Sequence, residues 1–377
     1  MEGTVVLLHN RTIRLGLRCL IAVTALSLFG AFSDLSSHHV IAAEGPSSSE
    51  PSAQPRLEDI LQQRKSIYDH IEAKTHVPWQ RLAAIDQYER TMAKIPKKSA
   101  EAALHQQNNV NRLTAIQIQE SIWIGWLNPD YTDQNPKSIL LFSGLGKDGS
   151  GDGIADPNND LDLLYSVASF VGSYGSSADD FSIGLWNYYH NPSAVKRINQ
   201  FAKIYATFGY VPLDQHAFPV PLQSSYAYRS TWGTGRSWGG YRIHEGTDIF
   251  ASYGVPVRST CFGIIETKGW NPFGGWRIGI RDLNNYYHYY AHLSGFEKSL
   301  QIGDLVKPAQ TIGWVGSSGY GKPGTQGKFP PHLHYGIYRD RGLVEWSFDP
   351  YPSLKRWENE ERRAIAAKNK AKKAADQ

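Results

Sequence analysis

The pattern of apolar positions changes once along the chain, near residue 211. Before this point, apolar side chains recur three or four residues apart, which is the spacing of one helix face. This spacing predicts helices over residues 57–71, 79–92, 161–171 and 194–208. After it, short β-branched and aromatic runs alternate with glycine-containing turns, which is typical of antiparallel strands. The expected fold class is therefore α+β, an α-rich N-terminal module followed by an antiparallel β-sheet domain.

The N-terminal segment has the pattern of an export signal. Arg11, Arg14 and Arg18 precede an uncharged apolar run over residues 19–33, and two alanines follow at 42–43. A positively charged N-terminal region, a short apolar stretch and small residues after it are typical of secretory signals. We therefore expect a signal peptide or a membrane anchor, with the protein acting outside the cytoplasm. Membrane contact is expected only through this segment.

Composition divides the chain into five expected parts. A Ser/Pro/Gly-rich stretch predicts a flexible linker. The C-terminal end, rich in Lys, Arg, Glu and Ala, predicts a solvated helix or a disordered tail. The expected parts are a signal or anchor over 1–43, a linker over 44–56, an α-rich module over 57–210, a β domain over 211–354 and a charged tail over 355–377.

Charge and cysteine content exclude other classes of protein. The net charge is +4 and charged residues are 20%, without the clustered Lys/Arg stripe of a nucleic-acid-binding protein. The two cysteines are Cys19, inside the signal, and Cys261, so a cleaved protein can form no internal disulfide. Cys261 lies in an alternating β-branched run and is expected to be a buried strand residue.

The β domain contains three histidine motifs. The even separation of His244 and Asp248 lets both face one side of an extended segment. The same argument places His332 and His334 on one strand face, and it predicts one face for the two histidines of HYYAH over 288–292. A catalytic Zn²⁺ takes three N or O ligands and leaves one position for water. Two histidines and one aspartate would supply that set.

These motifs resemble those of a known family. HEGTD, YYAHL and PPHLH, in this order and with Gly-rich turns between them, are similar to the motifs of the lysostaphin/LytM-type zinc metallopeptidases, peptidase family M23. The similar stretch covers about residues 241–349 and includes VPVRST, GDLV and IGWVGSSG. The resemblance implies an exported zinc endopeptidase that cuts amide bonds in the peptides of peptidoglycan.

The resemblance also implies roles for individual residues. Zn²⁺ would be bound by His244, Asp248 and His334. His332 would act as the general base for the attacking water, and His292 would stand beside the developing oxyanion. The metal would lower the pKa of its water from 15.7 towards 7.

Three positions depart from the family pattern. His288 stands where the family usually has Thr and is expected to be structural. Trp276 follows the turn glycines in place of Asn, and Gly336 follows HLHY in place of Glu. These changes concern the shape of the groove rather than the metal. The stretches YGVPVRST, GGWRIGIRD and EWSFDPYP resemble most the sporulation L-alanyl-D-glutamate endopeptidases, which implies cleavage of the L-Ala–D-Glu bond in spore cortex.

The α-rich module carries a second resemblance. HVPWQRLAAIDQYER, over residues 76–90, resembles the first catalytic helix of lysozyme-like transglycosylases, where Glu89 would be the acid with a pKa raised by burial. Arg90 stands where those enzymes have Ser, and no Gly-x-Met-Gln motif follows. We therefore expect a scaffold or glycan-binding module, with a transglycosylase centred on Glu89 as the alternative.

An Asp/Gly-rich loop lies within the same module. Asp148, Asp152 and Asp156 place oxygens at positions 1, 5 and 9 of a loop with Gly153 at position 6, the pattern of a Ca²⁺ loop. Plain turns rich in Asp and Gly are the alternative reading.

One further alternative concerns the whole protein. Some relatives of this type have lost their metal and only bind the wall or regulate other hydrolases. The chain keeps all three expected ligands and both flanking histidines, which favours the enzyme.

Overall fold

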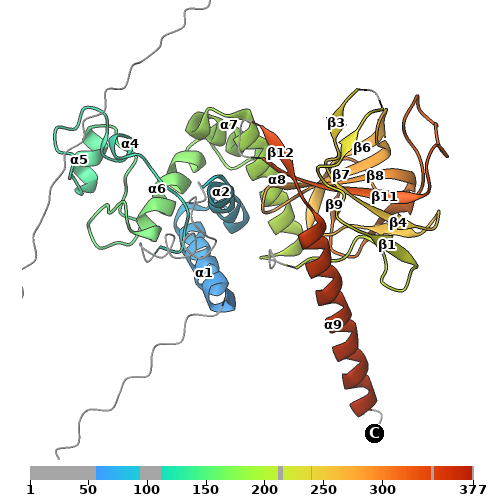
Figure 1. Ribbon diagram of the computed structural model, residues 1–377. Coiled ribbons are helices and arrows are strands. Elements are labelled where there is room, and N and C mark those ends of the chain that lie inside the picture. The colour runs from blue at the N-terminus through green and yellow to red at the C-terminus, as the bar shows by residue number, and fades with distance from the viewer. Residues whose placement is uncertain (1–56, 94–111, 211–214, 239, 341–343, 376–377) are drawn as a thin grey trace, which may run out of the picture. The chain divides into compact units, whose positions relative to one another are not determined.

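The computed structural model describes residues 57–93, 112–210, 215–238, 240–340 and 344–375 (Figure 1). The expected signal or anchor and the linker lie outside these residues. Within them, no helix combines the length and the apolar character needed to cross a membrane. Helices come first along the chain and antiparallel strands follow, so the predicted α+β class is confirmed.

Local sequence signals explain where the helices begin. The α-rich part contains α1 (Leu57–Thr75), α2 (Trp79–Met92), α4 (Glu120–Ile124), α5 (Pro136–Leu141), α6 (Asp160–Gly172), α7 (Ala178–Tyr189) and α8 (Pro192–Phe208). Side chains of Asn159 and Asn191 accept backbone N–H groups in the first turns of α6 and α8. Ser177 and Asp180 form a reciprocal capping box at α7. Such caps satisfy N–H groups that have no partner within the helix.

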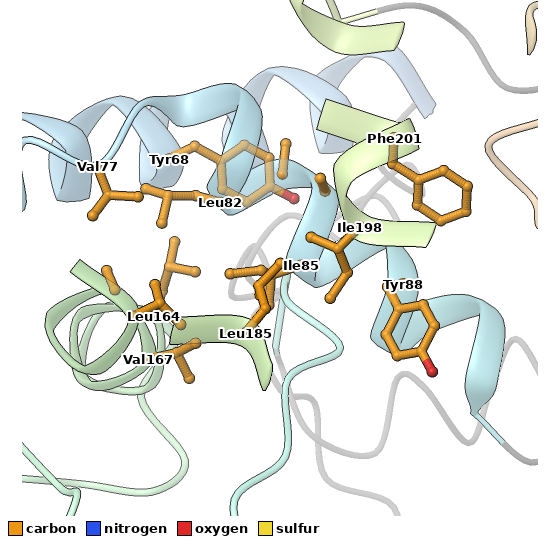
Figure 2. Close-up of a cluster of buried hydrophobic side chains, with 14 of the residues drawn as sticks. Tyr68, Val77, Leu82, Ile85, Tyr88, Leu164, Val167, Leu185, Ile198 and Phe201 are labelled. Atoms are coloured by element: carbon orange, nitrogen blue, oxygen red, sulfur yellow. The ribbon is translucent and has the colours of Figure 1, made fainter. Parts of the chain in front are cut away.

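One apolar core joins α1, α2, α6, α7 and α8, and a smaller separate cluster holds α4 and α5. Figure 2 shows Leu82 and Ile85 of α2 directed towards Leu164 of α6 and Ile198 of α8. All four side chains are fully buried. Leu82 and Ile85 are three residues apart in α2, which is the spacing of one helix face.

The sheet domain is antiparallel throughout its described pairs. Its main path runs β1-β4-β11-β8-β7-β6-β9, with β10 pairing β5 and β8, and β12 pairing β11. A separate hairpin pairs β2 with β3. The strands are β1 (Tyr226–Tyr228), β2 (Gly235–Arg236), β3 (Arg242–Ile243), β4 (Thr247–Ala251), β5 (Pro256–Arg258), β6 (Gly263–Asn271), β7 (Gly275–Asp282), β8 (Tyr286–Phe296), β9 (Leu305–Val306), β10 (Thr311–Val315), β11 (His332–Asp340) and β12 (Glu345–Phe348).

The C-terminal segment is a helix that begins earlier than the expected tail. Helix α9 spans Tyr351–Ala375, and its first turns bury Leu354 and Trp357 in the core of the sheet domain. The Trp357 ring also stacks on His216, with ring centroids 4.6 Å apart. The first turns of α9 therefore belong to the packed domain, and the later turns are exposed.

Polar contacts join the helices to the sheet. Arg197 of α8 pairs with Glu266 of β6 and with Asp340 of β11. The side-chain amide of Gln87 in α2 donates to the carbonyl of Leu283, at 2.8 Å, and Leu283 is part of the helical core. These contacts connect the helical part to the sheet domain.

Candidate metal centre

Two neighbouring strands place the metal-type ligands opposite one another. In the antiparallel pair of β4 and β11, Asp248 lies directly across from His334. His332 shares a face with His334, because side chains alternate along a strand, and Leu333 between them is fully buried in the core. Gly246 is required here, since a Cβ at this position would lie 2.8 Å from His334 Nε2.

Three ligand atoms converge at this point. His244 Nε2 lies 3.0 Å from Asp248 Oδ1, and His334 Nδ1 lies 3.1 Å from the same oxygen. The two imidazole nitrogens are 2.8 Å apart. The sequence-predicted set His244, Asp248 and His334 thus forms a group that could hold one metal ion. Two imidazoles and one carboxylate are a donor set that suits Zn²⁺.

The surroundings orient these ligands. His244 donates its Nδ1–H to the carbonyl of Thr231, at 2.9 Å, which leaves Nε2 free as a ligand. Arg236 Nη2 donates to Asp248 Oδ2 at 2.8 Å and so leaves Oδ1 towards the histidines. Burial raises the pKa of Asp248, but hydrogen bonds from His244 and His334 outweigh burial and hold it well below its usual range. Asp248 is therefore ionised at neutral pH.

The two flanking histidines are also oriented by backbone carbonyls. His332 donates Nδ1–H to Pro330 at 2.9 Å, and His292 donates Nδ1–H to Ser318 at 2.7 Å. His332 Nε2 lies 3.7 Å from Asp248 Oδ1, and the two flanking rings are 4.8 Å apart between centroids. Burial lowers the pKa of both imidazoles. Each ring is therefore neutral at pH 7 and presents an unprotonated Nε2.

The structure corrects one inference from the sequence. His288 and His292 lie on opposite faces of β8, not on one face. His292 has a left-handed backbone, with φ of 62°, and its N–H bonds to the carbonyl of Gly274. The register between β7 and β8 slips at this point, which marks a β-bulge. A bulge breaks the alternation of side chains and turns His292 towards His332.

His288 belongs instead to a buried polar network. Its Nε2 lies 3.1 Å from Asp282 Oδ2, and its Nδ1 lies 2.7 Å from the hydroxyl of Tyr335. Cys261 is the third member of this buried group, and its thiol is free. Burial lowers the pKa of His288, but Cys261 and Asp282 outweigh burial and raise it to about 10. Both ring nitrogens are thus engaged by hydrogen bonds within this network, and the structural role expected for His288 stays a prediction.

A pocket of about 540 Å³ opens over the metal group. Its size is within the range of small-ligand sites. The metal-group residues and both flanking histidines line it. Other side chains that line it include Arg236, Arg242, Phe250, Phe273, Tyr320 and Phe329.

Several groups of this site were missed by the sequence reasoning. Arg236 and Arg242 shortly precede HEGTD in the stretch GRSWGGYRIHEGTD, so their nearness to the motif was a usable signal. The carbonyls of Thr231, Pro330 and Ser318 orient the imidazoles through backbone atoms. Backbone acceptors can come from any residue type, so no side-chain pattern marks them.

Glu89 lies elsewhere, in the last turn of α2, and does not line this pocket. Its carboxyl is partly buried, and burial raises its pKa to about 7. This raised pKa agrees with the expectation for a lysozyme-like acid. The catalytic role of Glu89 stays a prediction.

The expected calcium loop finds no support. Asp148 accepts backbone N–H groups of Gly151 and Gly153, at 2.6 and 2.8 Å. Asp152 and Asp156 each accept the N–H of the residue two positions further on. None of the three belongs to a metal-capable group among the described residues. The carboxylates close turns within the loop, which is the alternative reading.

Comparison with known proteins adds independent findings. Residues 242–346 match the family model of peptidase family M23. Over 314 residues the chain is 53% identical to the L-Ala–D-Glu endopeptidase of Bacillus subtilis (strain 168), covering 83% of this chain and 94% of that protein. It is 36% identical over 115 residues to lysostaphin of Staphylococcus staphylolyticus, covering 30% of this chain and 22% of that protein. The catalytic domain of lysostaphin from Staphylococcus simulans has a TM-score of 0.28 and 31% identity, covering 35% of this chain and 92% of that one.

Proposed function

Since this chain belongs to peptidase family M23, we propose that it hydrolyses the L-Ala–D-Glu bond of peptidoglycan stem peptides, including those of spore cortex. It is a peptidoglycan metallo-endopeptidase by its family and by its identity to an endopeptidase along most of its length. The convergence of His244, Asp248 and His334 beneath the pocket carries the metal-dependent hydrolysis, and the identity to an L-Ala–D-Glu endopeptidase along most of the chain supports the choice of bond. Because peptidoglycan lies outside the cytoplasmic membrane, we place the activity there.

We assign the zinc ligands to His244 Nε2, Asp248 Oδ1 and His334 Nδ1. When bound, Zn²⁺ supplies Lewis-acid polarisation of the scissile carbonyl and lowers the pKa of water. The donors are two imidazole nitrogens and one ionised carboxylate oxygen, so the residues present fit this ion. This complete ligand set argues against the metal-free, wall-binding alternative.

His332 is the group that moves the proton. Its Nδ1–H is committed to the carbonyl of Pro330, so its neutral ring accepts a proton at Nε2. That nitrogen faces the ligand group, 3.7 Å from Asp248 Oδ1. His332 would take a proton from the attacking water and return it to the leaving amine.

His292 has a related but separate role. Its Nδ1–H is likewise committed, to the carbonyl of Ser318, and Nε2 is left as an acceptor. While the imidazole of His292 is neutral, its Nε2 can accept a hydrogen bond from water and orient it. The ring donates to the developing oxyanion once it has taken up a proton, and losing one such donor typically costs about 2.7–4 kcal/mol.

We propose a scaffold role for the helical part. The bonds from Gln87 and Arg197 to the sheet domain support this role. A transglycosylase centred on Glu89 is the alternative, and it predicts that Glu89→Gln removes glycan cleavage while peptide cleavage persists.

Zinc retention and turnover in three variants test the assignment. We expect His334→Ala to lose both bound zinc and activity, because it removes a ligand. We expect His332→Ala to keep zinc and lose turnover. His70→Ala, at an exposed histidine of α1, is the matched control. Loss of zinc from His332→Ala, measured by elemental mass spectrometry, would show that the ligand set is wrong.

A further inference from the structure

Two arginines of the β2–β3 hairpin face each other at the pocket. Arg236 and Arg242 are direct cross-strand partners, and both line the pocket. Like charges placed directly opposite one another are destabilising. Arg236 is compensated by Asp248, with its Nη2 at 2.8 Å from the carboxylate. Arg242 is the member of the pair whose charge needs another partner.

Arg242 has no such partner within the described part of the chain. No carboxylate there lies within ion-pair distance of its guanidinium, and its Nε is buried without a hydrogen bond. The guanidinium is held over the ring of Phe273, 4.9 Å from its centroid. A cation–π contact fixes the position of an arginine and leaves its N–H groups free to donate.

The remaining charges of the pocket do not neutralise this arginine. Asp248 is engaged by Arg236 and by the two ligand histidines. Glu245 also lines the pocket, and the hydroxyl of Tyr338 donates to it at 3.3 Å. Among the described residues that line the pocket, Arg242 is therefore the arginine without a carboxylate partner, and it lies beside the point where the peptide bond would be cut.

We propose that Arg242 binds the free carboxylate of the glutamyl residue on the amine side of the scissile bond, which makes the enzyme selective for stem peptides whose glutamyl carboxylate is not amidated. This inference rests on the proposed L-Ala–D-Glu specificity. A glutamyl residue has two carboxyl groups, and only one can continue the peptide chain. The other remains ionised at neutral pH unless it is amidated.

The chemistry of the guanidinium explains the selectivity. Arginine matches a carboxylate with two parallel N–H···O bonds, whereas a carboxamide offers one acceptor oxygen and no charge. Hydrogen bonds to charged groups are stronger than hydrogen bonds between neutral groups. The difference corresponds to about a tenfold preference for the carboxylate substrate. Arg242 would thus be a specificity residue, and the metal group would perform the hydrolysis on either substrate.

A pair of synthetic substrates tests this inference. Both contain L-Ala–D-Glu, and they differ only in a free carboxylate or a carboxamide on the glutamyl residue. We measure kcat/KM of the zinc-loaded full chain on each. The wild type is expected to prefer the free carboxylate about tenfold. Arg242→Met is expected to lose this preference through slower cleavage of the acidic substrate alone, and Arg242→Lys is expected to restore part of it.

Arg229→Met is the matched control, since Arg229 is exposed and outside the pocket. It removes the same charge and should keep the preference. Equal slowing of both substrates by Arg242→Met would overturn the inference and indicate a structural role. A wild type that cleaves both substrates equally would also overturn it and leave the proposed function standing. Cleavage of neither, with another wall bond cut, would refute the proposed function and this inference together.

Discussion

Glu266 of β6 is the centre of the charge cluster that joins the helical part to the sheet. It pairs with Arg197 and Lys196 of α8 and with Arg281 of β7. Its side chain is only 6% exposed. Burial raises the pKa of this carboxyl, but the guanidinium groups of Arg281 and Arg197 outweigh burial and hold it at about 2. The carboxylate is therefore stabilised by the folded structure.

This shift sets the size and sign of a pH effect. A fall from 4.5 to about 2 corresponds to about 3 kcal/mol, at about 1.4 kcal/mol for each pKa unit. The pKa is lower in the folded state, so this contribution is complete above pH 4.5 and is lost as the pH falls towards 2. About 2 kcal/mol of it should already be lost at about pH 3.

Urea unfolding of the wild type and Glu266→Gln, followed by circular dichroism between pH 7 and pH 3, measures this contribution. We expect the wild type to be more stable at pH 7 by several kcal/mol, about 3–5, because the variant leaves buried arginines without their partner. The difference should shrink by about 2 kcal/mol by about pH 3. Glu360→Gln, in an exposed pair with Arg356, is the control and should show no such trend. A difference for Glu266→Gln that does not change with pH would refute the reasoning.

Two other predictions concern stability. Burial raises the pKa of Glu89 to about 7, so its ionisation costs stability as the pH rises from 4.5 through 7. Glu89→Gln should therefore raise the melting temperature at pH 8 but not at pH 4, and should leave stem-peptide cleavage intact; equal effects at both pH values would contradict this. Trp357→Ala should lower the free energy of unfolding by about 3–5 kcal/mol, because it empties a buried site between α9 and the sheet. Urea unfolding measures this loss, and a change below about 1 kcal/mol would show that α9 is not part of the packed domain.

Much of the fold follows from local sequence. The spacing of apolar residues predicted a helix over 79–92, and α2 spans Trp79–Met92. Helix α7 (Ala178–Tyr189) was not predicted, although Ser177 and Asp180 mark its start as a capping box. The segment 355–377 was expected to be a solvated helix or a disordered tail; it is helical, but the packing of its first turns was missed because their charged neighbours hide the apolar residues.

The convergence of His244, Asp248 and His334 could be predicted from the sequence, whereas the orientation of the surrounding groups could not. Alternation along β11 placed His332 and His334 on one face, as the strand register shows. The same rule failed at His292, because this residue lies in a β-bulge with a left-handed backbone. Its N–H bonds to the carbonyl of Gly274, a contact that the spacing of residues does not reveal. The contact of Arg236 with Asp248 depends on a hairpin folding over the strand, which spacing alone does not encode.

The central claim is that zinc held by His244, Asp248 and His334 cleaves the L-Ala–D-Glu bond. Mass spectrometry of purified peptidoglycan, vegetative and cortex, after digestion with the purified full chain tests it most directly, with and without a zinc chelator. The account predicts stem cleavage that leaves a single L-alanine on muramic acid and disappears with the chelator. Anhydro-muramyl products that survive chelation would contradict it and place the chemistry at Glu89.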